Sequence, residues 1–202
     1  MATHPLQAPL AYAKLNVVAK VEKIVRKTPE PQVTATKSAG REAPLFGERL
    51  PDALLNALHT NNRINQYLIE NIDPAAWRAK PPGGKGRTIA AIVAHMHNVR
   101  VMWLKVSARG SEIPGQLDRA RVNPTQARHA MDQSCQALSE LIGHSLAGDG
   151  RVKGFRPDVA GFLGYLIAHD VHHRGQIAML TRQLGHPLPQ KVIFGMWEWN
   201  SR

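Results

Sequence analysis

Residues 166–177 have the sequence Leu-Ile-Ala-His-Asp-Val-His-His-Arg-Gly-Gln-Ile and lie near the C-terminal end of the chain. His169 and His173 are four residues apart, so a helix would place both imidazoles on one face, where a single divalent metal ion could reach both. The surrounding apolar residues recur at helical spacings, which predicts one long helix whose apolar stripe passes through the two histidines. These residues are Phe162, Leu166, Ile177, Leu180 and Leu184.

Two interpretations of this histidine pair remain open at this point. A histidine on an apolar face is usually a core residue with a satisfied hydrogen bond, but two at this spacing would each need a buried partner of its own. A third ligand from another helix would favour a metal site, because catalytic-type sites commonly combine three protein ligands with water. The rest of the sequence therefore has to be searched for that third residue.

Length and composition predict one sizeable domain and a tail in the 202 residues. The sequence has no run of about 18 apolar residues and no evident signal peptide, so we expect no membrane span. Cys135 is the single cysteine, which excludes an intrachain disulfide and is consistent with a cytoplasmic location. We expect Cys135 to be a small core residue rather than a nucleophile.

The net charge of +11 raises the question of a nucleic-acid partner. The lysines and arginines are spread along the whole chain, and no zinc-finger spacing or aromatic-interleaved basic motif accompanies them. Nucleic-acid binding is therefore not favoured.

Residues 1–46 differ in composition from the rest of the chain. Residues 11–27 are basic and fit either a short amphipathic helix or a strand, and the segment that follows is rich in linker residues such as Pro and Thr. We predict a partly disordered N-terminal arm over 1–46 and a folded domain over 47–202.

The domain is predicted to be all-α, an up-down four-helix bundle. Thr88 is a plausible N-cap and Gly185 a helix stop. Asn61, Asn62 and Asn65 interrupt the apolar face of the first helix, either as solvated residues or as the lining of a polar cavity. The four helices are expected over residues 51–72, 89–108, 124–146 and 158–184, and the aromatic tail that includes Trp197 and Trp199 should pack back over them.

The second helix supplies the candidate third ligand. Its apolar stripe predicts that His95 points to the core side, whereas His97 falls on the flank and should be partly exposed. His129 and His144 lie off the buried stripe of the third helix and are expected at the surface. The stripe of the second helix comprises Ile89, Ile92, Met96, Val99, Trp103 and Val106.

With these residues identified, residues 51–202 resemble the DinB/YfiT-like family of metal-dependent helical-bundle proteins. Three parts carry the resemblance. The first is His95 followed by Trp103, the second is the segment from His169 through His173 to Gln176, which is similar to the family's HxxxHRGQ motif, and the third is the Trp-Glu-Trp end at 197–199.

The resemblance implies one divalent metal ion, nickel or zinc, held by His95, His169 and His173. It also implies a homodimer and, in some relatives, transfer of a low-molecular-weight thiol onto an electrophile. His172 departs from the pattern as an extra histidine beside the pair. A metal-dependent enzyme acting on a small molecule, as a thiol S-transferase or a hydrolase, is the leading hypothesis; a non-catalytic metal-binding or structural bundle in a stress response is the alternative.

Asp170 and two further residues of this helix receive no catalytic role from the sequence. Asp170 follows a proposed ligand directly and could be its partner or a surface residue. Arg174 and Gln176 could stabilise helix packing or cap the ligand-bearing face.

Overall fold

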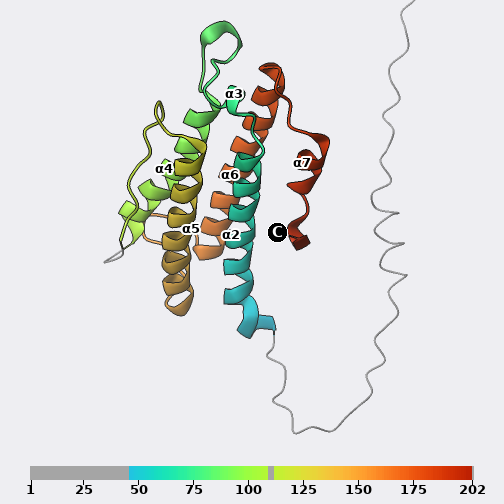
Figure 1. The fold of residues 1–202 in the computed structure, drawn as a ribbon. Coiled ribbons are helices and arrows are strands. Elements are labelled where there is room, and N and C mark those ends of the chain that lie inside the picture. Colours follow the sequence, from blue (N-terminus) through green and yellow to red (C-terminus); the bar gives the residue numbers. More distant parts are fainter. Residues whose placement is uncertain (1–45, 109–111, 202) are drawn as a thin grey trace, which may run out of the picture. The chain divides into compact units, whose positions relative to one another are not determined.

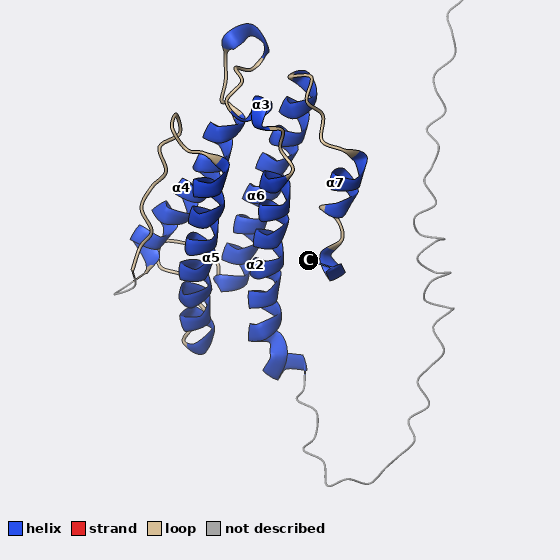
Figure 2. Cartoon of the chain, viewed as in Figure 1, coloured by secondary structure: helices blue, strands red, loops and turns tan. Residues whose placement is uncertain are grey.

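A computed structural model describes residues 46–108 and 112–201 of the chain. The predicted arm lies almost wholly outside these residues. Within them every regular element is helical and none is a strand, which confirms the all-α prediction (Figure 2). The elements are α2 (Phe46–Glu70), α3 (Pro74–Trp77), η1 (Pro82–Gly84), α4 (Ile89–Ser107), α5 (Pro124–Ala147), α6 (Val159–Gln183), α7 (Gln190–Gly195) and η2 (Trp199–Ser201).

Local side-chain caps set the starts of three long helices. The Thr88 hydroxyl accepts a hydrogen bond from the Ala91 backbone N–H, and Asp158 caps α6 in the same way. Asn123 and Gln126 form a reciprocal capping box at the start of α5. These three starts lie within a residue of their predicted positions.

The start of α2 differs from the prediction. The helix begins at Phe46, so Pro51 lies inside it rather than in its first turn. Proline lacks the N–H that would bond the carbonyl of Gly47, four residues earlier, and its ring crowds that carbonyl, yet the helix continues past this position. The predicted end of this helix at Ile72 is close to its end at Glu70.

Four long helices lie side by side: α2 packs against α5 and α6, and α4 packs against the same two helices (Figure 1). No helix of the described part is both long and apolar enough to cross a membrane.

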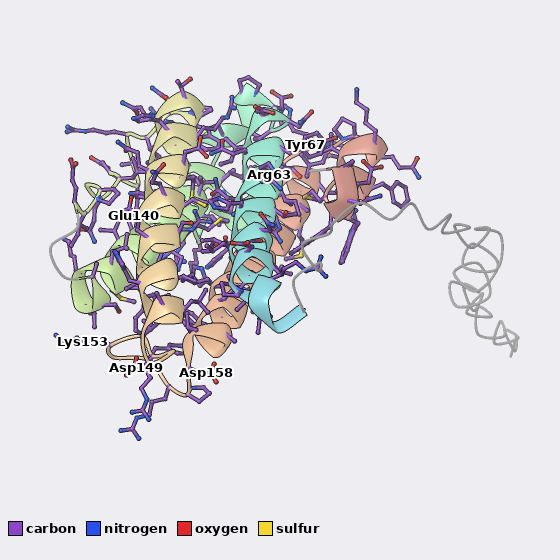
Figure 3. All side chains as sticks on the ribbon, turned by 90° about the horizontal axis from the view of Figure 1, so that it is seen from below. Arg63, Tyr67, Glu140, Asp149, Lys153 and Asp158 are labelled. Carbon is purple, nitrogen blue, oxygen red and sulfur yellow. The ribbon has the colours of Figure 1, made fainter. Side chains whose placement is uncertain are left out.

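The predicted alternation of helix directions fails between α4 and α5. At one end, Ser107 Oγ at the end of α4 donates to the Lys153 carbonyl beyond the end of α5 at 2.8 Å. At the other end, Trp77 Nε1 donates to the carbonyl of Val122, just before α5, at 2.9 Å. Both helices therefore run in the same direction, as Figure 1 shows, and Lys153 lies near the far end of α5 in Figure 3. The connection from 108 to 123 is long enough to return along the bundle, since α4 is only about 28 Å long.

The buried face of α4 is rotated relative to the predicted stripe. His97, which was assigned to the flank, is almost fully buried, and so is Arg100. Val99 and Trp103 are only partly buried and Val106 is 45% exposed, although all three were assigned to the core. This rotation leaves His95 half-buried at the edge of the core rather than within it.

A buried ion pair explains why α4 turns Arg100 inward. The Arg100 guanidinium lies 2.7 Å from Asp170 Oδ2 of α6, and both side chains are only 2% exposed. Burial alone would raise the pKa of Asp170, but the Arg100 charge and the hydrogen bonds to the carboxylate hold it well below its usual range. Asp170 is therefore ionised, and a helix period calculated from apolar residues could not detect this partner.

The three asparagines of α2 complete this polar network. Asn61 and Asn65 both donate to Asp170 Oδ2, at 2.7 and 2.8 Å, and both accept from Arg174 through their side-chain oxygens. Asn62 accepts from Arg100 at 2.9 Å. All three asparagines are buried, so the solvated interpretation is wrong. Their amides form hydrogen bonds with charged groups that would otherwise be costly to bury.

The C-terminal tail returns to the core only in part. Val192 of α7 is fully buried and joins the core cluster at this end of the bundle, as the sequence predicts for the tail. Trp197 is 77% exposed and Trp199 40%, so the two tryptophans that motivated the prediction are not core residues.

Helix α6 ends in a Schellman motif. The Gly185 N–H donates to the Arg182 carbonyl at 3.1 Å, and the His186 N–H donates to the Thr181 carbonyl at 2.9 Å. Gly185 has φ +79°, a conformation that L side chains adopt only with strain. This geometry explains why the predicted helix stop is a glycine.

Replacing Gly185 by alanine should lower the free energy of unfolding by about 1 kcal/mol, because the left-handed conformation would then carry a Cβ. Urea unfolding followed by circular dichroism measures the change. Gly164→Ala is the matched control: Gly164 lies inside α6 and a Cβ there meets nothing within 4 Å. The control should keep or raise stability, and equal losses in both variants would contradict the argument.

Asp170→Asn should lower the free energy of unfolding of the metal-free protein by about 3–5 kcal/mol, because it leaves the Arg100 charge buried without a counter-charge. The same urea experiment, with a chelator present, tests this. Asp118→Asn is the control: Asp118 forms an exposed ion pair with Arg121 at 3.6 Å, and its loss should cost at most about 0.5 kcal/mol. A small effect of Asp170→Asn would show that the network does not hold the helices together.

Candidate metal centre

Three histidines converge where α4 faces α6. The structure brings His95 of α4 together with His169 and His173 of α6, and one ring nitrogen of each lies within 4.8 Å of those of the other two. The Nε2 atoms of His169 and His173 are 3.2 Å apart. His173 is buried, while His95 and His169 are partly exposed, so the cluster is reachable from solvent.

Hydrogen bonding fixes the ring of His173. Its Nδ1 lies 2.8 Å from the side-chain oxygen of Gln176, which can only accept, so Nδ1 carries the proton. The Nε2 atom of neutral His173 therefore presents a lone pair toward His169. The Gln176 amide group donates in turn to Nε2 of His172 at 2.9 Å.

His172 lies outside the convergent cluster. Its ring is on the exposed side of α6 and engages Gln176, and the three clustered nitrogens include none from His172. The extra histidine thus contributes to the orientation of Gln176 rather than to the cluster itself.

His169 sits between the polar network and an aromatic cluster. The Asp170 carboxylate, fixed by Arg100, has Oδ1 at 3.8 Å from Nδ1 of His169. This is longer than a hydrogen bond, but the negative charge favours a proton on Nδ1 and hence a lone pair on Nε2. On its other side, the Tyr165 ring lies 6.1 Å from the His169 ring, centroid to centroid. The Tyr165 ring also packs against the ring of Trp103.

His95 is held in its neutral form. Burial, the positive charge of Arg87 and the neighbouring histidines lower the pKa of His95 to about 4. Burial also lowers the pKa of His173, against the opposing effect of the Gln176 hydrogen bond. Both imidazoles are therefore unprotonated near neutral pH, which is the form that binds metal.

The donor set fits a divalent transition metal ion. Imidazole nitrogens bind such ions at about 2.0–2.1 Å, which in a tetrahedral site separates two ligand nitrogens by about 3.3 Å. The 3.2 Å between His169 and His173 matches that value, and the His95 nitrogen lies within 4.8 Å of both. Three imidazoles would leave coordination positions open for water or a substrate.

The prediction that His97 is partly exposed is wrong. This histidine is fully buried, and its Nε2 lies 2.8 Å from the Gly115 carbonyl. The neighbouring Asn98 exchanges two hydrogen bonds with the backbone of Leu117, at 2.8 and 3.0 Å. Both side chains therefore fasten the connection between α4 and α5 along α4, a long-range partnership that no local sequence pattern signals.

Two pockets open beside the histidines. One, with a volume of about 580 Å³, is lined by His95, apolar residues of α4 and Arg119. The other, about 390 Å³, is lined by Lys85, Arg87 and Gln176. Sequence reasoning missed these cations, because they lie in connections whose path is set by tertiary contacts. The glycine-rich composition of 81–86 was the only local signal.

The remaining predictions about single residues agree with the structure. Cys135 is buried and burial raises the pKa of its thiol, so it has the character of a core residue rather than a nucleophile. His129 and His144 are exposed, as predicted.

Comparison with known proteins identifies the family. The family model described as the DinB family matches residues 47–196. A crystal structure of a candidate DinB-family member from Exiguobacterium sibiricum 255-15 is similar in fold, with a TM-score of 0.50 and 22% identity; the match covers 70% of this chain and 96% of the other. No curated protein matches the chain. From the family match over most of its length, the chain belongs to the DinB family.

Proposed function

We propose that this DinB-family protein binds one divalent metal ion, nickel or zinc, through His95, His169 and His173, and that it is a metal-dependent enzyme acting on a small molecule. The observation that carries the proposal is the pair of Nε2 atoms 3.2 Å apart in His169 and His173. Nδ1 of His173 faces the Gln176 oxygen and Nδ1 of His169 lies 3.8 Å from the Asp170 carboxylate, an arrangement that favours lone pairs on both Nε2 atoms.

These two nitrogens and a ring nitrogen of His95, which all lie within 4.8 Å of one another, would hold the ion. A proton shared by the two rings is the competing explanation, and metal content distinguishes the two. The polar network supports the metal explanation, because ligand histidines commonly direct their second nitrogen to a carboxylate or carbonyl group.

A divalent ion bound here would act as a Lewis acid that lowers the pKa of a thiol or of water, which suits thiol transfer or hydrolysis. The chain's own residues would then supply three imidazole ligands, keep the hydrogen bond between Gln176 and His173, and leave two pockets open to a substrate. A non-catalytic, structural role for the metal is the alternative, and the open pockets beside the histidines favour the enzyme.

The proposal also includes a cytoplasmic homodimer, expected from the single cysteine and the family resemblance. Sedimentation at micromolar concentration would test the dimer. A thiol co-substrate of low molecular weight is proposed on the same resemblance.

Purified protein should contain about one equivalent of nickel or zinc, measured by elemental mass spectrometry. The double variant His169→Ala/His173→Ala should contain none, because it removes two of three donors. His172→Ala is the matched control, since it removes a neighbouring histidine that lies outside the cluster. Absence of metal from the wild type, even after addition of nickel or zinc, would leave the shared proton as the explanation.

Gln176→Ala should weaken metal binding by about 10–100-fold, because His173 would lose the acceptor that fixes its ring and tautomer. Competition with a chromogenic chelator measures the affinity. The control His144→Ala, which removes an exposed histidine of α5 outside the cluster, should bind metal within a fewfold of wild type. An equal loss in the two variants would show that the Gln176–His173 bond has no particular role.

A further inference from the structure

We propose that the substrate at this centre carries an anionic group, a carboxylate or a phosphate, and that Arg87 and Arg119, one in each of the two pockets near the histidines, attract it. This inference rests on the proposed metal site and names the chemical class of its substrate. It assigns Arg87 and Arg119 as specificity-determining residues of the two pockets that open beside the cluster.

The first argument is the placement of positive charge. His95 and Arg119 line one pocket together, and the second pocket joins Arg87 and Lys85 to Gln176, the residue that bonds His173. A small molecule in either pocket therefore meets a guanidinium, next to His95 in the first pocket and next to the partner of His173 in the second. Opposite charges attract each other more strongly beside a protein surface than in bulk water, because the effective dielectric constant is lower there.

The second argument is that these cations are not neutralised. In the described part of the chain, neither guanidinium has a hydrogen bond or an ion pair, and neither pocket is lined by a carboxylate. The acidic residue next to Arg119, Asp118, is engaged elsewhere, with Arg121 and with the Ala120 N–H. The nearest described acid on α6, Asp170, is buried and saturated by the network behind the histidines.

The third argument is that Arg119 is carried by an anchored segment. His97 and Asn98 fasten this connection to α4 at Gly115 and Leu117. At its other end, Trp77 and Arg78 bond the backbone just before α5. A guanidinium on a fixed backbone loses less freedom when it pairs with an anion than one on a free loop.

The remaining lining indicates the rest of the ligand. Val99, Met102 and Leu117 are the apolar members of the pocket that contains His95, and Met102 is 45% exposed. We therefore expect a short apolar segment between the group that meets the histidines and the anionic group.

The test uses full-length protein loaded with cobalt or nickel and three thiols of equal length: 3-mercaptopropionate, 3-mercapto-1-propanol and 3-aminopropane-1-thiol. Thiolate-to-metal charge-transfer absorption gives the dissociation constant of each. The carboxylate should bind about tenfold more tightly than the alcohol and the amine should bind weakest. Added salt should reduce this preference.

Arg87→Gln and Arg119→Gln should each reduce the preference for the carboxylate, and the double variant should bring it within about twofold of unity. Arg121→Gln is the matched control, because it removes the same charge from the same segment but lines neither pocket. It should keep the wild-type preference. An equal loss in Arg121→Gln would attribute the preference to the net charge of the chain and overturn the assignment.

Failure of this inference is separable from failure of the proposed function. Equal affinity for the three thiols, or binding of none, by protein that holds one equivalent of metal overturns the anionic substrate and leaves the metal site intact. Protein that takes up no metal overturns the metal site, and this inference with it.

Discussion

The buried ion pair between Arg100 and Asp170 is the interaction on which the rest of this bundle depends. Desolvating two charges is expensive, and the attraction between them offsets that cost only when their remaining polar groups are also satisfied. Here Asn61 and Asn65 of α2 donate hydrogen bonds to the carboxylate, and their side-chain oxygens accept hydrogen bonds from Arg174. With the Met131 carbonyl of α5 accepting from Arg100, one network reaches all four long helices.

The same pair fixes the position of the candidate metal centre. Because Arg100 must reach Asp170, α4 turns the face with His97 inward, and His95 comes to the edge of the core. The second oxygen of Asp170, Oδ1, lies toward His169, 3.8 Å from its Nδ1. The polar network therefore lies behind the histidines and the solvent-facing pockets lie in front of them. Histidines at this boundary are backed by buried hydrogen bonds and are still partly exposed, which the proposed metal site would require.

The path of the chain between α4 and α5 decides what surrounds the histidines. A short turn would have made these helices antiparallel and left the outer side of α4 open. Instead the connection returns along α4 and is fastened there by His97 and Asn98. It brings Arg119 to a pocket shared with His95, and so gives the open side of the centre a positive charge.

The sequence by itself determined the features that arise within one or two helical turns. Apolar periodicity located the four long helices, side-chain caps at Thr88, Asn123 and Asp158 located three starts, and the four-residue spacing placed His169 and His173 together. It also pointed to His95, although through an apolar stripe that proved to be rotated. These features follow from short-range geometry, which a single sequence contains.

Only the tertiary structure decided which groups meet across helices. The burial of Arg100, the partners of the three asparagines, the role of His97 and the direction of α5 all depend on contacts between residues far apart in the chain. A charged residue on a helix face is normally solvated, and only a counter-charge from another helix reverses that expectation. Such a partner leaves no periodic signal in the sequence, so its effect becomes visible only when the helices are packed.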